Sequence, residues 1–315
     1  MTTTTTAAPV TVSAAAQLST SETENSGRDN RPGWLFSSPF LLIYAIFLIG
    51  PVLIGLVISF FNTATVKSDL GGWVGLENYG DVLSSSDFWK SMWHSTLFTI
   101  LTVPFLVILP LIVAIFAGRI NRGRWFYRFA FFAPYVVPSA SVALIFAYMY
   151  SPEIGLLTKA FTGLGLPDPG FLSTPKGAWF AVTLLTVWWT FGFNFVLYTA
   201  ALQEVPEETY EAAALDGAGP WQQIRSITVP LLRPTIALVL MLQILASLKV
   251  FDQIYILLQG GPNGATRPVI EYIYDTGFTS YRAGYAGAAT MVYFLILVVI
   301  SAAWMFATRR RGTNA

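Results

Sequence analysis

Long intervals without a charged residue constrain the fold of this 315-residue chain more than any other feature. Five intervals contain no Asp, Glu, Lys or Arg: 34–66, 91–118, 129–152, 177–203 and 283–308. A sixth apolar stretch, 234–259, is interrupted only by Lys249 and Asp252. Each stretch is longer than the ~20 residues that an α-helix needs to cross the hydrocarbon of a bilayer.

These stretches predict an all-α membrane protein with six transmembrane helices. The strands of a membrane β-barrel alternate apolar and polar residues, whereas these runs are evenly apolar and too long for such strands. The predicted helix cores lie near 38–62, 92–118, 127–150, 178–202, 234–258 and 284–308.

The composition excludes several other classes of protein. Charged residues make up only 11% of the chain, against about 25% in soluble domains, which argues against a soluble enzyme. The net charge of +1 gives no indication of a nucleic-acid partner. The chain has no cysteine, which excludes disulfides and thiolate metal sites, and its single histidine, His94, argues against a multi-histidine metal site.

The distribution of Lys and Arg predicts the orientation of the helices. If the N-terminus is cytoplasmic, eleven Lys and Arg residues fall on the cytoplasmic side and six on the other. Both termini are therefore predicted to be cytoplasmic. The polar residues 1–33 lack an apolar pattern, so they are predicted to form a disordered cytoplasmic tail. A transmembrane domain at 34–308 and a short cytoplasmic tail at 309–315 are predicted to follow.

The segment 203–233 differs from the other connections because it is long, polar and predicted to face the cytoplasm. Pro206 can begin a helix, and the two glutamates that follow it suit the N-terminus of a helix. Gly217 can end this helix, and Pro220 can begin a second, shorter one. A helical hairpin beside the membrane has a shape that suits a groove on another protein.

A signature with fixed spacing runs through this segment: Glu211, Ala212, Ala213, Asp216, Gly217, Ala218, Ile227, Val229 and Pro230. The signature resembles the EAA loop of the permease subunits of binding-protein-dependent ABC importers. The resemblance implies a type I ABC importer permease fold, in which this loop docks into a cleft of an ATPase subunit. It also implies that Glu211 and Asp216 make acidic contacts there, while the adjacent alanines permit close approach and Gly217 forms the turn. The alternative is a hairpin that packs only against this chain's own helices.

Two further stretches resemble the carbohydrate-importer branch of these permeases, which includes maltose, lactose and glycerol-3-phosphate permeases. The first is APYVVPS at 133–139, and the second runs from FDQIY at 251–255 through GGP at 260–262 to YIY at 272–274. The resemblance implies the permease subunit of an importer for a sugar or polyol, in the cytoplasmic (inner) membrane of a prokaryote.

The resemblance also implies that this chain works within a larger assembly. The expected partners are a second homologous permease, two ABC ATPase subunits, an extracytoplasmic solute-binding protein and membrane lipid, with no nucleic acid. The sequence contains no Gly-x-x-x-x-Gly-Lys-Ser/Thr phosphate loop. We therefore expect a non-catalytic subunit that binds no cofactor, while the partner ATPase uses ATP and Mg²⁺.

Polar residues within the predicted helices are candidates for the substrate pathway, because lipid disfavours them. They recur at intervals of four, which places each set on one helical face: Tyr135 and Ser139; Thr186, Thr190 and Asn194; Gln243 and Ser247. Ser and Thr can instead bond to their own backbone or join helices together. Lys249 and Asp252 can form a structural pair, act as a gate or attract an anionic substrate.

Two functions outside ABC import remain as alternatives. A secondary transporter would need ligands for a coupling ion, yet Lys249 and Asp252 are the only charges deep within the predicted helices. An intramembrane enzyme would need an acid–base or metal constellation, which none of these helices carries. Within ABC importers, a permease for glycerol-3-phosphate or another polar solute is the alternative to a sugar permease.

Overall fold

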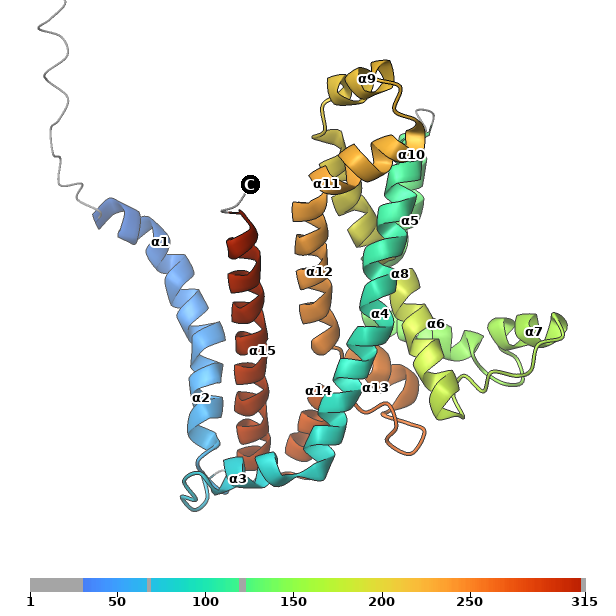
Figure 1. Ribbon diagram of the computed structural model, residues 1–315. Helices are drawn as coiled ribbons and strands as arrows, with labels where there is room; N and C mark the ends of the chain where they lie inside the picture. Colours follow the sequence, from blue (N-terminus) through green and yellow to red (C-terminus); the bar gives the residue numbers. More distant parts are fainter. Residues whose placement is uncertain (1–30, 67–68, 119–122, 313–315) are drawn as a thin grey trace, which may run out of the picture. The chain divides into compact units, whose positions relative to one another are not determined.

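The computed structural model describes residues 31–66, 69–118 and 123–312 (Figure 1). Every named element in these ranges is helical, as the sequence predicts. Only the last three residues of the predicted N-terminal tail are described, and they belong to the first helix. The chain divides into two compact units, Met1–Leu53 and Ile54–Ala315.

The first unit contains a helical segment with the composition of a membrane span. It consists of α1 (Arg31–Tyr44), a π-helical turn (Ala45–Ile49) and the start of α2 (Gly50–Ile58). The stretch Phe36–Ile58 is long and apolar enough to cross a membrane, and no side chain in its most apolar part is buried within the protein. An apolar helix with this exposure suits a lipid environment.

Three long helices of the second unit are each long and apolar enough to cross a membrane without a break. They are α4 (Ser86–Gly118), α8 (Pro175–Gln203) and α15 (Ala283–Gly312). With the span of the first unit, the described residues hold four unbroken candidate spans, or up to six if each of two bent helix pairs counts as one.

The first bent pair corrects the predicted helix at 127–150, which is not continuous. α5 (Arg124–Val136) ends before Pro138, and α6 (Ser139–Met149) continues at an angle of 92°. Val137 has an extended backbone, φ −72° and ψ 132°, because the ring of a following proline disfavours helical geometry in the residue before it.

The predicted helix at 234–258 is also wrong as a single helix. α12 (Arg233–Leu248) ends at Leu248, and a separate short helix, α13 (Asp252–Leu258), begins after three intervening residues. α12 is itself bent by 63° from the segment Pro220–Leu231 that precedes it. The apolar composition of the stretch is continuous although its helix is not.

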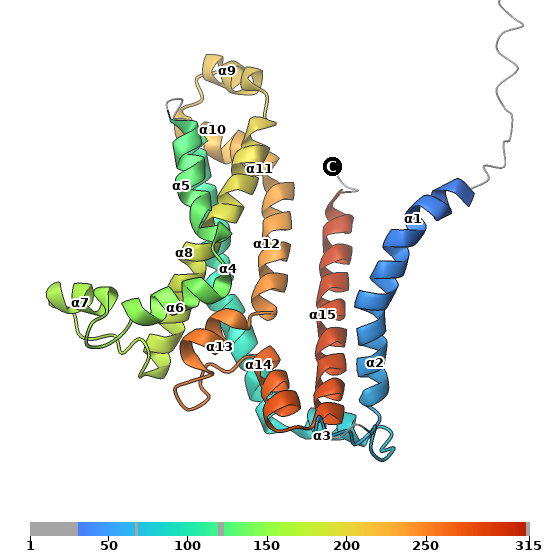
Figure 2. The same cartoon turned by 180° about the vertical axis from the view of Figure 1, so that it is seen from behind.

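Helices α4, α8 and α12 pack together at the centre of the second unit, and α5 packs against α8 (Figures 1 and 2). Buried side chains from these helices form one core, including Val103, Phe195, Tyr198 and Val239. The backbones of α5 and α8 approach closely at Gly192, where a Cβ atom would lie 2.0 Å from the carbonyl oxygen of Phe131. A small residue at this position therefore sets the distance between the two helices.

The ends of this helix bundle carry different structures (Figures 1 and 2). One end carries a hairpin made of α9 (Glu207–Leu215), α10 (Pro220–Gln223) and α11 (Val229–Leu231). The opposite end carries the short helices α3 (Glu77–Ser84), α13 (Asp252–Leu258) and α14 (Val269–Tyr274), and α7 (Leu156–Gly163) projects to the side beyond α6.

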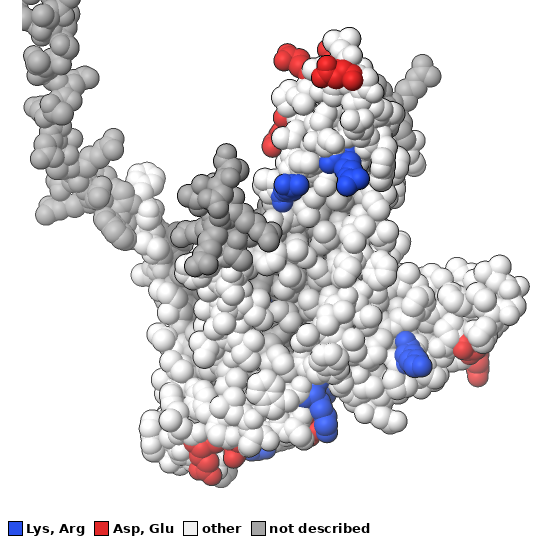
Figure 3. All heavy atoms as spheres, viewed as in Figure 1, with Lys and Arg blue, Asp and Glu red and all other residues white. Residues whose placement is uncertain are grey.

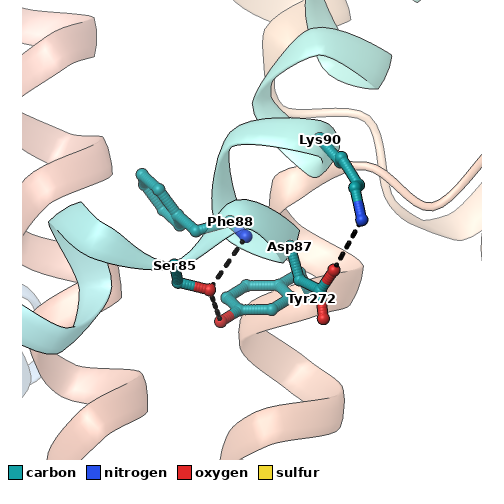
Figure 4. Close-up of polar contacts among 5 residues, drawn as sticks. All are labelled: Ser85, Asp87, Phe88, Lys90 and Tyr272. Carbon is teal, nitrogen blue, oxygen red and sulfur yellow. Dashed lines mark hydrogen bonds and ion pairs between the residues drawn. The ribbon is translucent and has the colours of Figure 1, made fainter.

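The start of α4 is tied to α14 at this opposite end (Figure 4). Ser85 caps α4 by accepting a hydrogen bond from the backbone N–H of Phe88, 3.3 Å away, and its hydroxyl lies 3.4 Å from that of Tyr272. Lys90 pairs with Asp87 at 3.2 Å on the same turn. A serine at this position satisfies a backbone donor that the first turn of a helix leaves open.

We predict that Gly192→Ala destabilises the protein, because the added methyl group would collide with the backbone of α5. Overpacking of this kind costs about 1–3 kcal/mol. The temperature of unfolding of the purified protein in detergent measures the effect. Gly80→Ala is the matched control, because nothing lies within 4 Å of a Cβ atom there. Equal unfolding temperatures for the two variants would contradict the close approach of α5 and α8.

Candidate functional site: the polar hairpin and the helix breaks

The hairpin has the helix–turn–helix structure that the sequence predicts. α9 begins directly after Pro206, and α10 begins with Pro220. Gly217 lies between them with φ +82°, a left-handed conformation that glycine adopts without strain. The backbone N–H of Ala218 donates to the carbonyl of Ala213 at 2.9 Å, which closes the C-terminus of α9.

The surface of the hairpin is largely free of contacts with the rest of the chain. No residue of α9 is buried, and Glu211, Ala212, Asp216 and Gly217 are all exposed. Figure 3 shows acidic side chains gathered at this end of the second unit. A hairpin that packed only against its own chain would bury one face of α9, so the exposure disfavours that alternative.

Two large apolar side chains of the hairpin are also exposed, and neither belongs to the predicted coupling residues. Leu215, at the end of α9, is 90% exposed, and Trp221, at the start of α10, is 73% exposed. Their position on either side of the Gly217 turn was visible in the sequence. Exposed apolar groups within a polar surface are typical of a contact with another protein.

The break between α5 and α6 separates two residues that were predicted to share a helical face. Tyr135 lies in α5, whereas Ser139 is the first residue of α6, so the prediction of a common face is wrong. The ring of Tyr135 stacks on Phe193 with centroids 5.1 Å apart. The indole N–H of Trp189 donates to the carbonyl of Val137 at 3.0 Å, which satisfies a backbone group that the break leaves open.

The second break lies beside the first. The Ser139 hydroxyl donates to a carboxylate oxygen of Asp252 at 2.7 Å, joining the first residue of α6 to the first residue of α13. Lys249 and Asp252 are both exposed, and within the described ranges no ion pair joins them. A pair within one helix is therefore wrong, because the helix ends between the two residues. A pair across a subunit interface stays a prediction.

The other predicted pathway residues are held by neighbouring helices. Asn194 donates to the carbonyl of Leu106 at 2.8 Å and accepts from Gln243 at 2.9 Å, so these buried amides join α4, α8 and α12. The buried Ser247 hydroxyl lies 2.9 Å from that of Thr99 in α4. These contacts agree with the alternative that such polar residues join helices together. A role of these residues in the substrate pathway stays a prediction.

Two threonines of α8 complete the predicted set. The buried Thr186 hydroxyl donates to the carbonyl of Val182 at 2.7 Å, one turn earlier in the same helix. Thr190 is partly buried, close in sequence to Trp189 at the first break. The structure therefore leaves Thr190 more accessible than Thr186.

The sequence did not indicate a buried carboxylate that lies at the opposite end of the bundle. Glu271 in α14 is 2% exposed, and one of its carboxylate oxygens has no hydrogen-bond partner. Burial, together with the negative charge of Asp275, raises the pKa of Glu271 to about 7, although Arg267 opposes the shift. Arg267 also lies 3.8 Å from Asp275. No local pattern marks Glu271, because its burial depends on the fold of the preceding loop.

The comparisons with known proteins place these features in one family. Residues 70–312 match the family described as the binding-protein-dependent transport system inner membrane component. The chain belongs to this family. Its hairpin and its helix breaks are therefore features of an inner-membrane transport permease.

Individual members of the permease family are similar to this chain along most of their length. The trehalose/maltose transport system permease protein MalF of Thermococcus litoralis is 34% identical over 273 residues, which are 87% of this chain and 91% of the relative. The crystal structure of a bacterial ABC transporter involved in the import of the acidic polysaccharide alginate has a TM-score of 0.78 at 26% identity, over 90% of this chain and 97% of the other. The alginate transporter in complex with an alginate pentasaccharide-bound periplasmic protein gives a TM-score of 0.79, also at 26% identity, over 90% and 96%. These similarities confirm the type I importer permease fold.

We predict that Glu271→Gln changes how the stability of the permease depends on pH. The pKa of Glu271 is raised from 4.5 to about 7 in the folded protein. Its contribution to stability is therefore complete below about pH 4.5 and is lost as the pH rises through about 7. The variant should unfold at a temperature a few degrees above the wild type at pH 8, since about 1 kcal/mol corresponds to 2–4 °C. The two proteins should converge at pH 5.

Glu77→Gln serves as the control for this comparison, because Glu77 is an exposed glutamate at the same end of the bundle. Its unfolding temperature should follow the wild type at every pH. A Glu271→Gln variant that also follows the wild type at pH 8 would show that Glu271 is ionised without penalty in the folded protein.

Proposed function

We propose that this chain is a permease subunit of an ABC importer that moves a sugar or oligosaccharide across the inner membrane. The exposed hairpin at 203–233 carries this proposal, because it combines the EAA signature with a surface that its own chain leaves open. The relatives support the substrate class, since they transport trehalose and maltose, and alginate. The chain itself hydrolyses nothing and holds no cofactor.

In this function the hairpin end faces the cytoplasm and docks on an ATPase subunit that uses ATP and Mg²⁺. Glu211 and Asp216 supply acidic contacts, Ala212, Ala213 and Ala218 permit close approach, and Gly217 provides the turn. The assembly holds two ATPase subunits, a second homologous permease and an extracytoplasmic solute-binding protein. Closure of the ATPase pair moves the hairpins and switches the access of the substrate cavity.

The first test compares the partners that co-purify with the wild type and with two hairpin variants. Gly217→Pro removes the left-handed turn, because proline cannot adopt a positive φ. Glu211→Lys reverses one exposed charge of the signature. Each variant should recover at least about tenfold less ATPase, which corresponds to about 1.4 kcal/mol, and should retain the second permease. Quantitative mass spectrometry of the purified complexes measures both subunits.

Glu208→Lys is the matched control, because it makes the same charge change on an exposed residue three positions earlier in α9. It should keep the ATPase. A wild type that purifies without any ATPase, or variants that transport normally, would contradict the coupling role and favour a self-contained carrier.

The substrate pathway is proposed to pass the two helix breaks. Tyr135 offers a partly exposed ring, and Ser139 and Asp252 offer a hydroxyl and an exposed carboxylate. Sugars bind to this combination, because their hydroxyls need hydrogen bonds and their faces need apolar contact. Thr190 directly follows Trp189, which contacts the first break. Thr186, Asn194, Gln243 and Ser247 would contribute only after their contacts between and within helices open.

We predict that Tyr135→Ala lowers sugar uptake about tenfold in proteoliposomes that hold the complete transporter, while the assembly stays intact. The loss reflects removal of the ring beside the first break, and about 1.4 kcal/mol corresponds to this factor. Thr186→Val should transport like the wild type, because the Thr186 hydroxyl is already satisfied by its own helix. If Thr186→Val lowered uptake more than Tyr135→Ala, the pathway would lie inside the α4–α8–α12 core instead.

An acidic sugar is the second candidate substrate. Lys249 is exposed beside the second break and is not paired with Asp252, and the alginate transporter imports an acidic polysaccharide. Competition assays with neutral and acidic oligosaccharides, repeated on Lys249→Gln, distinguish the two classes. An acidic substrate should lose affinity in this variant, whereas a neutral one should not.

A further inference from the structure

A cavity of about 470 Å³ lies between the hairpin and the ends of the neighbouring helices. Its walls come from the last turn of α4, the first turns of α5, the last turns of α8, and both helical arms of the hairpin. None of the residues assigned above to coupling or to the substrate pathway lines it. Its volume is within the range of about 300–1,000 Å³ that is typical of sites for small ligands.

Among the described residues that line the cavity, one side chain is positive and one is negative, and they come from separate elements. Arg128 comes from α5 and is half-buried, and Glu207 comes from the first turn of α9. In the part of the chain that the structure describes, neither residue has an ion-pair partner. A partly buried guanidinium without a counter-ion favours an anionic oxygen group, and phosphate oxygens fit its fork of donors well. A carboxylate across the same cavity favours a cationic group.

The remaining lining divides by polarity. Ile115, Phe195 and Leu202 form an apolar wall on the sides of α4 and α8, whereas Gln203 and Gln223 place amides near the hairpin. α4 ends at Gly118 and α8 at Gln203, so the cavity lies at the ends of these two candidate spans. Headgroups of phospholipids occupy this level of a bilayer, and pockets with basic residues between span ends bind them.

We propose that this cavity binds the headgroup of phosphatidylethanolamine, with its phosphate on Arg128, its primary ammonium on Glu207 and its glycerol and upper acyl chains against the apolar wall. The ligand carries both charges, which matches Arg128 and Glu207, the two charged residues among the described lining, better than an anionic lipid does. A bound lipid would connect the ends of α5 and α8 to α9. The position of the hairpin would then depend on the composition of the membrane. The assignment needs only a permease in a bilayer and does not rest on the ATPase coupling proposed above.

The test measures lipid retention by the purified transporter. The complex is delipidated, reconstituted in nanodiscs of equimolar phosphatidylethanolamine, phosphatidylglycerol and phosphatidylcholine, and released for native mass spectrometry of the lipids that stay bound. The wild type should retain phosphatidylethanolamine in preference to the other two. Arg128→Gln and Glu207→Gln should each lower this retention at least about fivefold, which corresponds to about 1 kcal/mol.

Two matched controls separate the cavity from general surface charge. Arg225→Gln and Glu208→Gln remove the same charges from exposed positions of the hairpin that do not line the cavity. Both should retain phosphatidylethanolamine like the wild type. Equal losses in the controls, or no preference among the three lipids, would overturn the proposal.

A second measurement does not depend on the folding of the variants. A photoactivatable phosphatidylethanolamine should cross-link in the wild type to peptides that contain Tyr127 or Tyr210, which both line the cavity. Cross-links only to the outer faces of the spans would overturn the assignment. Soluble phosphoethanolamine is added as a competitor, and full competition by this headgroup alone would assign the cavity to a soluble phosphate ester instead of a lipid.

Discussion

The backbone groups that are freed where two spans break have to be satisfied inside the protein, and the rest of the bundle is arranged around this requirement. Lipid offers no hydrogen bonds, so non-helical backbone at membrane depth persists only where protein groups or water meet it. Trp189 of α8 donates to the carbonyl of Val137 at the first break, and Tyr293 of α15 donates to the carbonyl of Leu248 at the second. Each break therefore fixes a neighbouring helix in place.

The two breaks also meet each other. The bond from Ser139 to Asp252 joins the helices that continue after each break, and α6 packs along α13. An exposed carboxylate at this position would be costly against lipid, since charged groups within a membrane face a bundle interior or water. If this side of the bundle lies within the membrane, it therefore faces protein or water rather than lipid.

Much of this architecture could be predicted from the sequence, because hydropathy reports the environment of a segment. The charge-free intervals predicted the long helices, and Pro206, Gly217 and Pro220 predicted the hairpin, since these residues act directly on the local backbone. Hydropathy does not report whether a helix continues through an apolar segment. The end of α12 at Leu248 depends on partners from other helices, such as Tyr293, which are distant in sequence.

The same distinction explains the outcome for individual site residues. Helical spacing placed Tyr135 and Ser139 on one face, but this rule fails when a proline break lies between the two positions. Gln243 and Asn194 form a hydrogen bond across two helices, and no spacing within either helix could reveal that pairing. Glu271 is 2% exposed although it lies outside every candidate membrane span of the described residues. The helix–turn–helix structure of the hairpin was predicted better because its residues share one local structure.

Helices α8 and α12 connect the hairpin to the two breaks, which gives the proposed coupling a mechanical route. α12 follows the hairpin and ends at the second break after 16 residues, a length of about 24 Å at 1.5 Å per residue. α8 leads into the hairpin, and the segment from Trp189 at the first break to Gln203 spans a similar length of about 22 Å. Displacement of the hairpin would therefore reach both breaks together. If α8 and α12 moved by different amounts, the Ser139–Asp252 hydrogen bond between the breaks would be the first contact to change.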